Sequence, residues 1–365
     1  MMDLSSRIYV AGHRGLVGSA IFRNLKSRGY TNLIGRSHAE LDLMDGAAVK
    51  AFFDAERPEY VILAAAHVGG IMANSRYRAD FIYNNLQIQQ NVIGESFRHG
   101  VKKLLFLGST CIYPREAPQP IKEDALLTSP LEYTNEPYAL AKIAGLRMCE
   151  SFNLQYGTNY IAVMPTNLYG PWDNFDLVNS HVLPAMIRKA HLARCLAEGL
   201  EEELRRDLAC RPVPGCSAED SSLAEIDEVL GSFGIFADRL ELWGSGRPLR
   251  EFLWSEDMAD ACVHIMNQVD FDDLRGEGPE VRNCHINIGS GKELSIRSLA
   301  ELVVKATGFS GALLFDASKP DGTMRKLTDV SKLHALGWSH TVEIEEGVPR
   351  LYRWYLDHQQ ERMRG

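Results

Sequence analysis

A glycine-rich loop near the N-terminus is the feature that most constrains the fold. Residues 7–11 have the apolar pattern of a buried strand, and Gly12, Gly15 and Gly18 follow at once with the spacing G-x-x-G-x-x-G. Residues 19–25 then carry apolar side chains on one face of a helix. Glycines between a strand and a helix let the backbone approach a pyrophosphate, which the N–H groups and dipole of the helix N-terminus hold. The alternative is a tight turn that binds nothing.

The first half of the chain alternates predicted strands with predicted helices. Apolar runs indicate strands at residues 60–64, 103–108 and 160–164, and amphipathic patterns indicate helices near 15–29, 46–56, 74–99 and 138–157. Such a pattern is typical of a parallel sheet with both faces covered. We therefore predict an α/β fold, a Rossmann-type doubly wound parallel sheet, whose ligands lie outside the carboxyl ends of the strands. Residues 1–170 are predicted to form this domain, with returning segments near 239–268 and 285–292.

The second half is less regular. Residues 171–365 are predicted to form a smaller α/β substrate domain, with helices at 181–191, 296–307 and 344–355. An acidic segment at about 193–238 shows no strand alternation and reads as an insertion. Such a segment is usually a solvated helical excursion, but it could also cover a cleft or contact a neighbouring subunit.

Two arginines indicate which dinucleotide the loop would bind. Arg36 follows the second predicted strand, where an NAD site usually has a carboxylate, and Arg14 lies within the glycine loop. A guanidinium matches the 2′-phosphate that distinguishes NADP from NAD. The pattern favours NADP(H), and the alternative is a pair of solvated surface arginines.

A hydroxyl, a thiol, a phenol and a lysine are predicted to meet at one edge of the sheet. Ser109 and Cys111 follow the strand at 103–108, at its carboxyl end. Tyr138 and Lys142 are four residues apart and so share one face of a helix. We expect the ammonium, aided by a cationic nicotinamide, to lower the phenol pKa from about 10, so that the phenol exchanges protons near neutrality.

Composition indicates an ordinary globular enzyme. A formal net charge of −9 argues against a nucleic-acid partner. Seven cysteines, without framework or metal-ligand spacing, fit a reducing compartment, so we expect a cytoplasmic protein without a metal. No leader peptide precedes the first strand, and no apolar run reaches about 18 residues, so no membrane segment is expected.

Strings along the chain together closely resemble the GDP-L-fucose synthase family of extended short-chain dehydrogenases/reductases. They are residues 12–20, 65–71, 107–114, 135–142, 164–171 and 243–252. The likeness covers nearly the whole chain except about 193–238. It implies an enzyme that epimerises C3 and C5 of GDP-4-keto-6-deoxy-D-mannose, a nucleotide sugar, and then reduces the C4 ketone with NADPH.

The resemblance also implies roles for individual residues. Cys111 would be the base and His181 the acid of epimerisation, although chemically either could take either part. Ser109 and Tyr138 would hold the enolate oxygen, and Tyr138 with Lys142 would serve the reduction. The cofactor-binding residues would be Gly12, Arg14, Gly15, Leu16, Val17, Gly18, Arg36, Asp42, Leu107, Tyr138, Lys142, Pro165, Asn167, Leu168 and His181. The substrate-binding residues would be Lys189, Trp243, Arg250 and Lys326, with Arg188 a further candidate for the diphosphate.

Two positions depart from the family pattern, and several alternatives stay open. His67 stands where the family more often has lysine, and Lys189 where it often has arginine, which puts the role of Lys189 in doubt. Cys111 could be a core residue, and His181 a capping or core histidine. Rival functions are another sugar-nucleotide epimerase or dehydratase of the same fold, or a non-catalytic NADP sensor.

A homodimer is implied by the same resemblance. The predicted helices near 74–99 and 138–157 would form its interface. The apolar residues proposed for this face are Ile82, Leu86, Val92, Leu146, Cys149 and Phe152. The same residues could instead belong to the core of the subunit.

Overall fold

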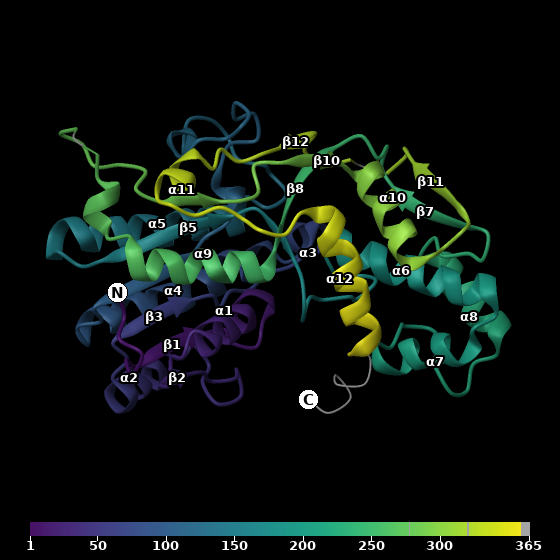
Figure 1. The fold of residues 1–365 in the computed structure, drawn as a ribbon, viewed down its shortest axis with the longest axis horizontal. Helices are drawn as coiled ribbons and strands as arrows, with labels where there is room; N and C mark the ends of the chain where they lie inside the picture. The colour runs from purple at the N-terminus through teal and green to yellow at the C-terminus, as the bar shows by residue number, and fades with distance from the viewer. Residues whose placement is uncertain (277, 320, 359–365) are drawn as a thin grey trace. The chain divides into compact units, whose positions relative to one another are not determined.

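The chain divides into two compact units. The computed structural model describes residues 1–276, 278–319 and 321–358. Unit 1 comprises Met1–Leu168, Glu251–Lys292 and Lys326–Thr341, and unit 2 comprises Tyr169–Arg250, Glu293–Arg325 and the residues from Val342 on (Figure 1).

Unit 1 is built on a parallel sheet. Among the described residues its strands are β1 (Ile8–Ala11), β2 (Leu33–Ile34), β3 (Tyr60–Leu63), β4 (Lys103–Leu107), β5 (Tyr160–Pro165) and β9 (Ile286–Ile288). Their order is β2-β1-β3-β4-β5-β9, and every neighbouring pair is parallel. The chain leaves β1 for β2 on one side and then crosses to β3 on the other side of β1. The strand order therefore reverses at β1, and open sheets bind ligands at such a switch point. The predicted Rossmann-type fold is confirmed.

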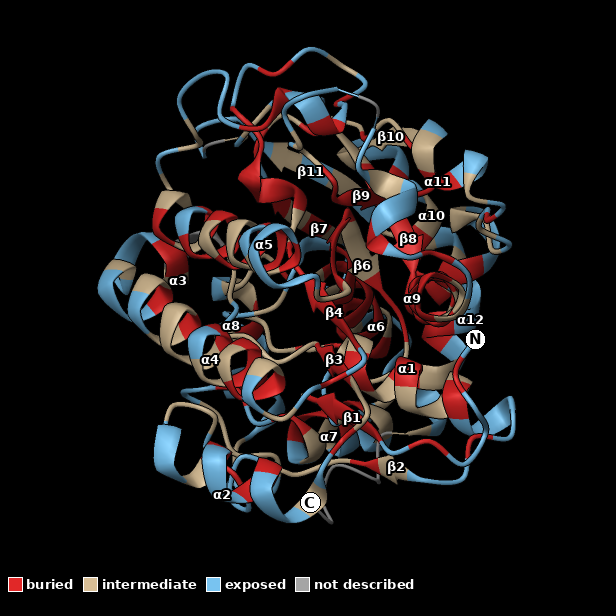
Figure 2. Cartoon of the chain, turned by 90° about the vertical axis from the view of Figure 1, so that its left-hand side faces the viewer, coloured by how far each residue is buried: buried red, intermediate tan, exposed pale blue. Residues whose placement is uncertain are grey.

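Helices cover both faces of this sheet. The helices of unit 1 are α1 (Leu16–Ser27), α2 (Gly46–Glu56), α3 (Ile71–Arg76), α4 (Arg78–Arg98), α5 (Glu136–Tyr156), α9 (Ser255–Gln268) and α11 (Ser331–Ala335). Short 3₁₀ turns are η1 (Thr110–Ile112), η2 (Glu123–Ala125) and η3 (Phe271–Leu274). Successive strand residues pack on opposite faces, so that Tyr9 and Phe106 join the core under α2, α4 and α5. Ile8 and Leu105 join the core under α1 and α9. Figure 2 shows the strands β1, β3 and β4 coloured as buried.

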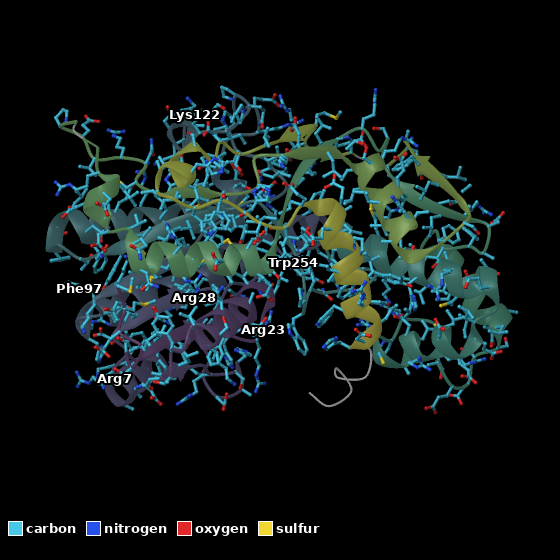
Figure 3. The ribbon with its side chains drawn as sticks, in the orientation of Figure 1. Arg7, Arg23, Arg28, Phe97, Lys122 and Trp254 are labelled. Carbon is cyan, nitrogen blue, oxygen red and sulfur yellow. The ribbon has the colours of Figure 1, made fainter. Side chains whose placement is uncertain are left out.

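Ion pairs fasten α1 to α9 at the surface. Arg23 pairs with Glu256 at 2.5 Å, and Arg28 pairs with Asp260. Figure 3 labels both arginines, Arg23 on α1 and Arg28 at its C-cap. Each of the four side chains is more than a third exposed, so these pairs contribute little stability. The helix predicted near 74–99 is interrupted at Tyr77, which ends α3 and precedes α4.

Unit 2 is mainly helical. Its helices are α6 (Val182–Glu198), α7 (Glu201–Cys210), α8 (Leu223–Ser232), α10 (Ile296–Thr307) and α12 (Ile344–Asp357), and its strands β7 (Arg239–Trp243) and β11 (Ala312–Asp316) form a parallel pair. The chain passes between the units within or beside the short strands β6 (Asn167–Tyr169), β8 (Leu249–Trp254), β10 (Glu293–Ser295) and β12 (Arg325–Lys326), and once more between Thr341 and Val342.

The acidic insertion forms the helices α7 and α8. Most of their charged residues are exposed or partly exposed, whereas Asp207 and the apolar residues Leu204, Leu208, Ile226 and Leu230 are buried. The insertion is therefore helical, and it is also part of the core of unit 2. None of the helices in the described part of the chain combines the length and the apolar character that crossing a membrane requires.

Candidate active site

The glycine loop has the geometry that a pyrophosphate site requires. Gly12 adopts a φ of +83°, and a Cβ there would lie 2.8 Å from the backbone nitrogen of Ala65, beyond the end of β3. A Cβ on Gly18 would lie 2.1 Å from the carbonyl oxygen of Gly12. A Cβ on Gly15 would meet only that same oxygen, at 3.5 Å, so the space beside Gly15 is open. The loop therefore fits a dinucleotide.

The first turn of α1 supplies hydrogen-bond donors to this space. Gly15 is the N-cap residue, and no side chain caps the helix, so Leu16 and Val17 open a helix whose first N–H groups suit an anion. These residues are the ones that the sequence assigned to the cofactor.

Arg36 is held in place beyond the end of β2. Its guanidinium carbon lies 5.7 Å from the centre of the Phe52 ring. The guanidinium donates a hydrogen bond to the carbonyl oxygen of the preceding residue, Gly35, at 2.9 Å, and it forms an ion pair with Glu56. Arg14, in the glycine loop, interacts electrostatically with Glu40, as Arg36 does. The positive charges of Arg14 and Arg36 thus both reach the region around Glu40, and two guanidinium groups there suit a 2′-phosphate.

Asp42, which the resemblance also assigns to the cofactor, has its contacts within its own turn. Its carboxylate accepts a hydrogen bond from the backbone N–H of Met44 at 2.9 Å and lies 3.8 Å from the imidazole of His38. The side chain therefore closes its own turn. His13, which the sequence reasoning left without a role, packs its ring against Gly35, where a Cβ would come within 2.6 Å of it.

Ser109 and Cys111 form a tight turn at the carboxyl end of β4. Ser109 caps the 3₁₀ turn η1, and its hydroxyl accepts a hydrogen bond from the backbone N–H of Cys111 at 3.3 Å. The thiol is only 7 % exposed, and burial raises its pKa. The charges of Lys326 and Lys142 and a hydrogen bond with Ser109 oppose this rise. Lys326, expected at the substrate diphosphate, thus acts electrostatically on the thiol.

Tyr138 and Lys142 lie together near the same strand end. Lys142 donates a hydrogen bond to the carbonyl oxygen of Leu107 at 2.8 Å, and its ammonium nitrogen is 5.7 Å from the centre of the Tyr138 ring. The helix begins at Glu136, two residues before the predicted start, and the side chain of its N-cap residue Asn135 makes no capping hydrogen bond. Helical spacing brings the two groups side by side.

The expected lowering of the Tyr138 pKa is wrong. Burial raises the pKa of the phenol and lowers the pKa of Lys142 to about 8. Desolvation penalises the charged form of each group and is the largest cause of both shifts. The phenol therefore keeps its proton at neutral pH, which makes it a proton donor rather than a base.

The ends of β5 and β6 contact the backbone of Glu251, a buried residue that the sequence reasoning missed. Pro165 ends β5, and Leu168 lies on β6 beside Asn167, which donates a hydrogen bond to the carbonyl oxygen of Glu251 at 2.8 Å. The Glu251 side chain is fully buried. Its carboxylate accepts hydrogen bonds from Thr328, through the N–H at 3.0 Å and the hydroxyl at 2.6 Å, and from the N–H of Gly291 at 2.7 Å.

A second missed group anchors the turn that holds Ser109 and Cys111 to β9. The Tyr113 hydroxyl donates a hydrogen bond to the side chain of Asn287 and lies 2.9 Å from Nε2 of His285. Burial lowers the pKa of His285 to about 3, so this imidazole is neutral. Tyr113 lies in the same string as Cys111, but its partners are more than 170 residues away in the sequence.

In unit 2, Arg188 is not available to a substrate. It is fully buried on α6, where it pairs with Asp207 at 2.9 Å and donates hydrogen bonds to the carbonyl oxygens of Phe175, at 3.3 Å, and Arg211. The prediction for Arg188 is therefore wrong, because this side chain points into the core of the unit. Its neighbour Lys189 donates a hydrogen bond to the carbonyl oxygen of Phe233 at 2.6 Å.

The other assigned residues of unit 2 occupy its surface or its strands. His181 is the N-cap residue of α6, it is exposed, and its side chain makes no capping hydrogen bond. Trp243 ends β7 with 61 % of its surface exposed, and the ammonium of Lys319 lies 5.7 Å from its ring centre. Arg250 lies on β8 and donates a hydrogen bond to the carbonyl oxygen of Leu249 at 2.8 Å.

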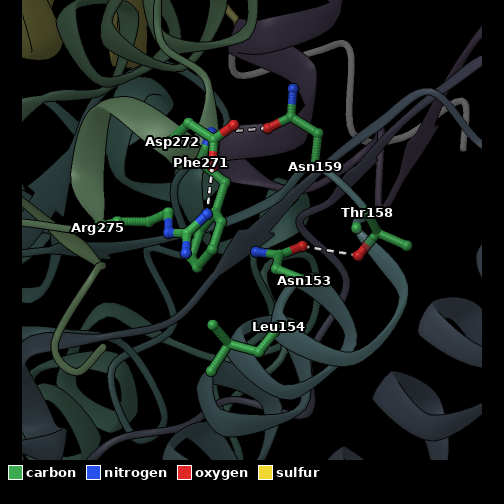
Figure 4. Close-up of a pocket in the computed structure, with 8 residues that line it drawn as sticks. Asn153, Leu154, Thr158, Asn159, Phe271, Asp272 and Arg275 are labelled. Carbon is green, nitrogen blue, oxygen red and sulfur yellow. Dashed lines mark hydrogen bonds and ion pairs between the residues drawn. The ribbon is translucent and has the colours of Figure 1, made fainter. Parts of the chain in front are cut away.

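One hollow of unit 1 lies at the other edge of the sheet. It has a volume of about 290 Å³ and is lined by residues that include Asn153, Thr158, Asn159, Phe271 and Arg275 (Figure 4). These residues surround the start of β5, whereas the turn with Ser109 and Cys111 follows the end of β4. The hollow is therefore separate from the assigned residues. The described ranges contain no group of three or more His, Cys, Asp or Glu side chains suited to a metal ion.

Known proteins match this chain along almost its entire length. It matches the NAD dependent epimerase/dehydratase family over residues 8–209 and 227–289. It is 51% identical to GDP-L-fucose synthase 1 of Arabidopsis thaliana, with 98% of this chain and 95% of the relative covered. It is 47% identical to the GDP-L-fucose synthase of Escherichia coli (strain K12), with 98% and 99% covered.

A solved structure extends the comparison to the cofactor. GDP-mannoheptose C4 reductase from Campylobacter jejuni, with NADP bound, is 45% identical, has a TM-score of 0.86, and matches over 97% of this chain and 99% of that chain. The glycine loop, the paired arginines and the Tyr138–Lys142 pair of this chain suit the same cofactor. The chain belongs to the NAD dependent epimerase/dehydratase family, in its GDP-L-fucose synthase branch.

Proposed function

We propose that this chain is an NADP-dependent epimerase/reductase that converts GDP-4-keto-6-deoxy-D-mannose to GDP-L-fucose. The reaction comprises epimerisation at C3 and C5, followed by reduction of the C4 ketone. The observation that carries the proposal is the gathering of Ser109, Cys111, Tyr138 and Lys142 at the carboxyl end of β4, in a chain about half identical to GDP-L-fucose synthases over nearly its full length.

Epimerisation uses the acidity that the C4 ketone confers on the hydrogens at C3 and C5. A base removes one of these hydrogens, and an acid on the opposite face of the ring returns a proton. We assign the base to Cys111 and the acid to His181. Because burial raises the pKa of Cys111, its thiolate depends on the nearby charges of Lys326 and Lys142. Ser109 and Tyr138 would stabilise the enolate oxygen by hydrogen bonds.

Reduction uses the same ketone. NADPH supplies the hydride when it is bound, through the chemistry of its nicotinamide ring. Tyr138 donates a proton to the C4 oxygen, and the raised pKa of its phenol keeps that proton available at neutral pH. Lys142, fixed on the carbonyl oxygen of Leu107, binds the nicotinamide ribose.

The remaining assignments are those that the family resemblance implies. Gly12, Gly15 and Gly18 hold the pyrophosphate of NADP with the first N–H groups of α1, and Arg14 and Arg36 hold its 2′-phosphate. Other cofactor contacts are assigned to Leu16, Val17, Asp42, Leu107, Pro165, Asn167, Leu168 and His181. Substrate contacts are assigned to Lys189, Trp243, Arg250 and Lys326.

We also infer a homodimer in the cytoplasm. Val92, Leu146 and Cys149, expected at the dimer face, are fully buried in the core of unit 1 and cannot form it. Tyr83 on α4 and Leu140 on α5 are exposed and offer apolar contacts instead. All seven cysteines are free, which suits a reducing compartment. Light scattering that returns the mass of one chain would refute the dimer.

Product analysis tests the proposed reaction. The protein is incubated with GDP-4-keto-6-deoxy-D-mannose and NADPH in deuterated water, and NADPH absorbance is followed. We expect stoichiometric loss of NADPH and GDP-L-fucose labelled at C3 and C5. A product without label indicates a C4 reductase, and product formation without net loss of NADPH indicates a redox-neutral epimerase or dehydratase. No turnover indicates a sensor.

A further inference from the structure

The acidic insertion holds α6 at two consecutive residues. Arg188 of α6 pairs with Asp207 of α7 at 2.9 Å, and Lys189 donates a hydrogen bond at 2.6 Å to the carbonyl oxygen of Phe233, which ends α8. Adjacent residues of a helix point in directions about 100° apart. The two contacts therefore fix both the rotation of α6 and the position of the Lys189 side chain.

Asp207 is the centre of a fully buried ionic cluster. Besides Arg188, its carboxylate lies 3.5 Å from the guanidinium of Arg211 and accepts a hydrogen bond from the hydroxyl of Tyr355 on α12. The Arg211 guanidinium also lies over the Tyr355 ring at 4.3 Å. One carboxylate thus serves two buried guanidinium groups. A buried charge that loses its partner is strongly unfavourable, so removal of this carboxylate forces the surrounding side chains to move.

The ammonium of Lys189 is also held by the insertion. Its acceptor, the carbonyl oxygen of Phe233, belongs to the C-cap residue of α8, at the negative end of that helix. This bond uses one of the three ammonium donors and leaves two for another ligand. Burial lowers the pKa of Lys189 to about 8. A neighbouring carbonyl and an arriving phosphate both favour the charged form of the amine.

We propose that Asp207 is a positioning residue for the substrate diphosphate, which acts by fixing α6 so that Lys189 presents its ammonium. The proposal rests on the proposed function, because Lys189 is taken to bind the diphosphate of the nucleotide sugar. The insertion then supports the binding site by holding α6 and does not itself contact the substrate. Asp207 itself, fully buried in its cluster, touches no ligand.

A double-mutant cycle on the full chain tests this coupling. The variants are Asp207→Asn, Lys189→Ala and the pair, and the matched control is Glu202→Gln, an exposed charge on the same helix. An Asn keeps the shape of Asp207 but places an amide donor opposite the donors of Arg211 or Tyr355. We expect either single change to raise the KM for the nucleotide sugar about tenfold, with the KM for NADPH within about twofold of wild type.

The combination distinguishes positioning from general damage. If Asp207 acts through Lys189, the pair raises the sugar KM no more than about twofold above Lys189→Ala alone. Multiplied effects, or equal losses for sugar and NADPH, would overturn the proposal. If Lys189→Ala leaves the sugar KM unchanged, the assignment of Lys189 fails first, whereas an effect of Lys189→Ala without one of Asp207→Asn refutes only the coupling.

A milder variant covers the case in which Asp207→Asn does not fold. Tyr355→Phe removes a single hydroxyl from Asp207 and leaves the three charges of the cluster in place. We expect a rise of about threefold in the sugar KM that disappears in the Lys189→Ala background. Persistence of the rise in that background would contradict the proposal.

Discussion

Glu251→Gln tests how far one buried carboxylate stabilises the segments that follow β9 and β12. The carboxylate accepts hydrogen bonds from the N–H of Gly291 and from the N–H and hydroxyl of Thr328. The fit is tight, because a Cβ on Gly289 would lie 2.2 Å from a carboxylate oxygen of Glu251. A glutamine keeps one acceptor oxygen, but its NH₂ group replaces the other. The hydroxyl of Thr328 can rotate to accept from that group, whereas its N–H cannot.

The expected loss of stability comes from the hydrogen bond of the Thr328 N–H, which the glutamine NH₂ group cannot accept. A hydrogen bond to a charged group contributes about 1.5–3 kcal/mol, and the orphaned N–H adds an unfavourable term. Burial raises the pKa of Glu251, so desolvation of the carboxylate already offsets part of this gain. We therefore expect a loss of about 2 kcal/mol in the free energy of unfolding, which corresponds to a fall in Tm of roughly 4–8 °C.

Thermal unfolding followed by circular dichroism measures this change. The matched control is Glu256→Gln on α9, where the same substitution removes a surface pair with Arg23. We expect the control to change stability by less than about 0.5 kcal/mol. A Glu251→Gln protein whose Tm lies within about 1 °C of the control would refute the reasoning, because the loss of a buried acceptor that serves three donors should destabilise the fold.

Further predictions concern the cofactor site. Tyr138→Phe removes the proton donor and should lower the rate of reduction at least about a hundredfold while NADPH affinity stays within about threefold, measured by fluorescence titration; a similar loss of affinity would make Tyr138 a binding residue. Arg36→Glu removes the guanidinium and should weaken NADPH binding about tenfold or more relative to NADH; an unchanged ratio of the two dissociation constants would remove Arg36 from the 2′-phosphate site. Burial lowers the pKa of Lys142 to about 8, so the free enzyme loses this charge above that pH, and NADPH affinity should decline from pH 8 to 10. A decline of the same size in Lys142→Met would assign it to another group.

The sequence predicted the frame of the cofactor site because that frame depends on local patterns. Continuous apolar runs specify buried parallel strands, and the glycine spacing specifies the turn after β1. Helical spacing places Tyr138 beside Lys142. These features depend on residues that are close together in the chain, so their period and spacing suffice.

The remainder depends on partners that only the folded chain brings together. Glu251 meets Thr328 across 77 residues, and Tyr113 meets Asn287 across 174. Arg188 and Lys189 are adjacent cations, and no local pattern tells which of them is turned into the core. The pKa of Tyr138 was misjudged for the same reason, because desolvation depends on side chains packed around the ring.

Deuterium uptake by Cys111→Ser measures the central claim, that one ketone serves two separable steps. The variant is incubated with GDP-4-keto-6-deoxy-D-mannose in deuterated water, and in parallel with an already epimerised 4-keto sugar nucleotide and NADPH. The account predicts that label at C3 and C5 falls at least about a hundredfold, while reduction of the epimerised ketone falls less than about tenfold. Equal losses in the two assays, or label at wild-type level, would contradict it.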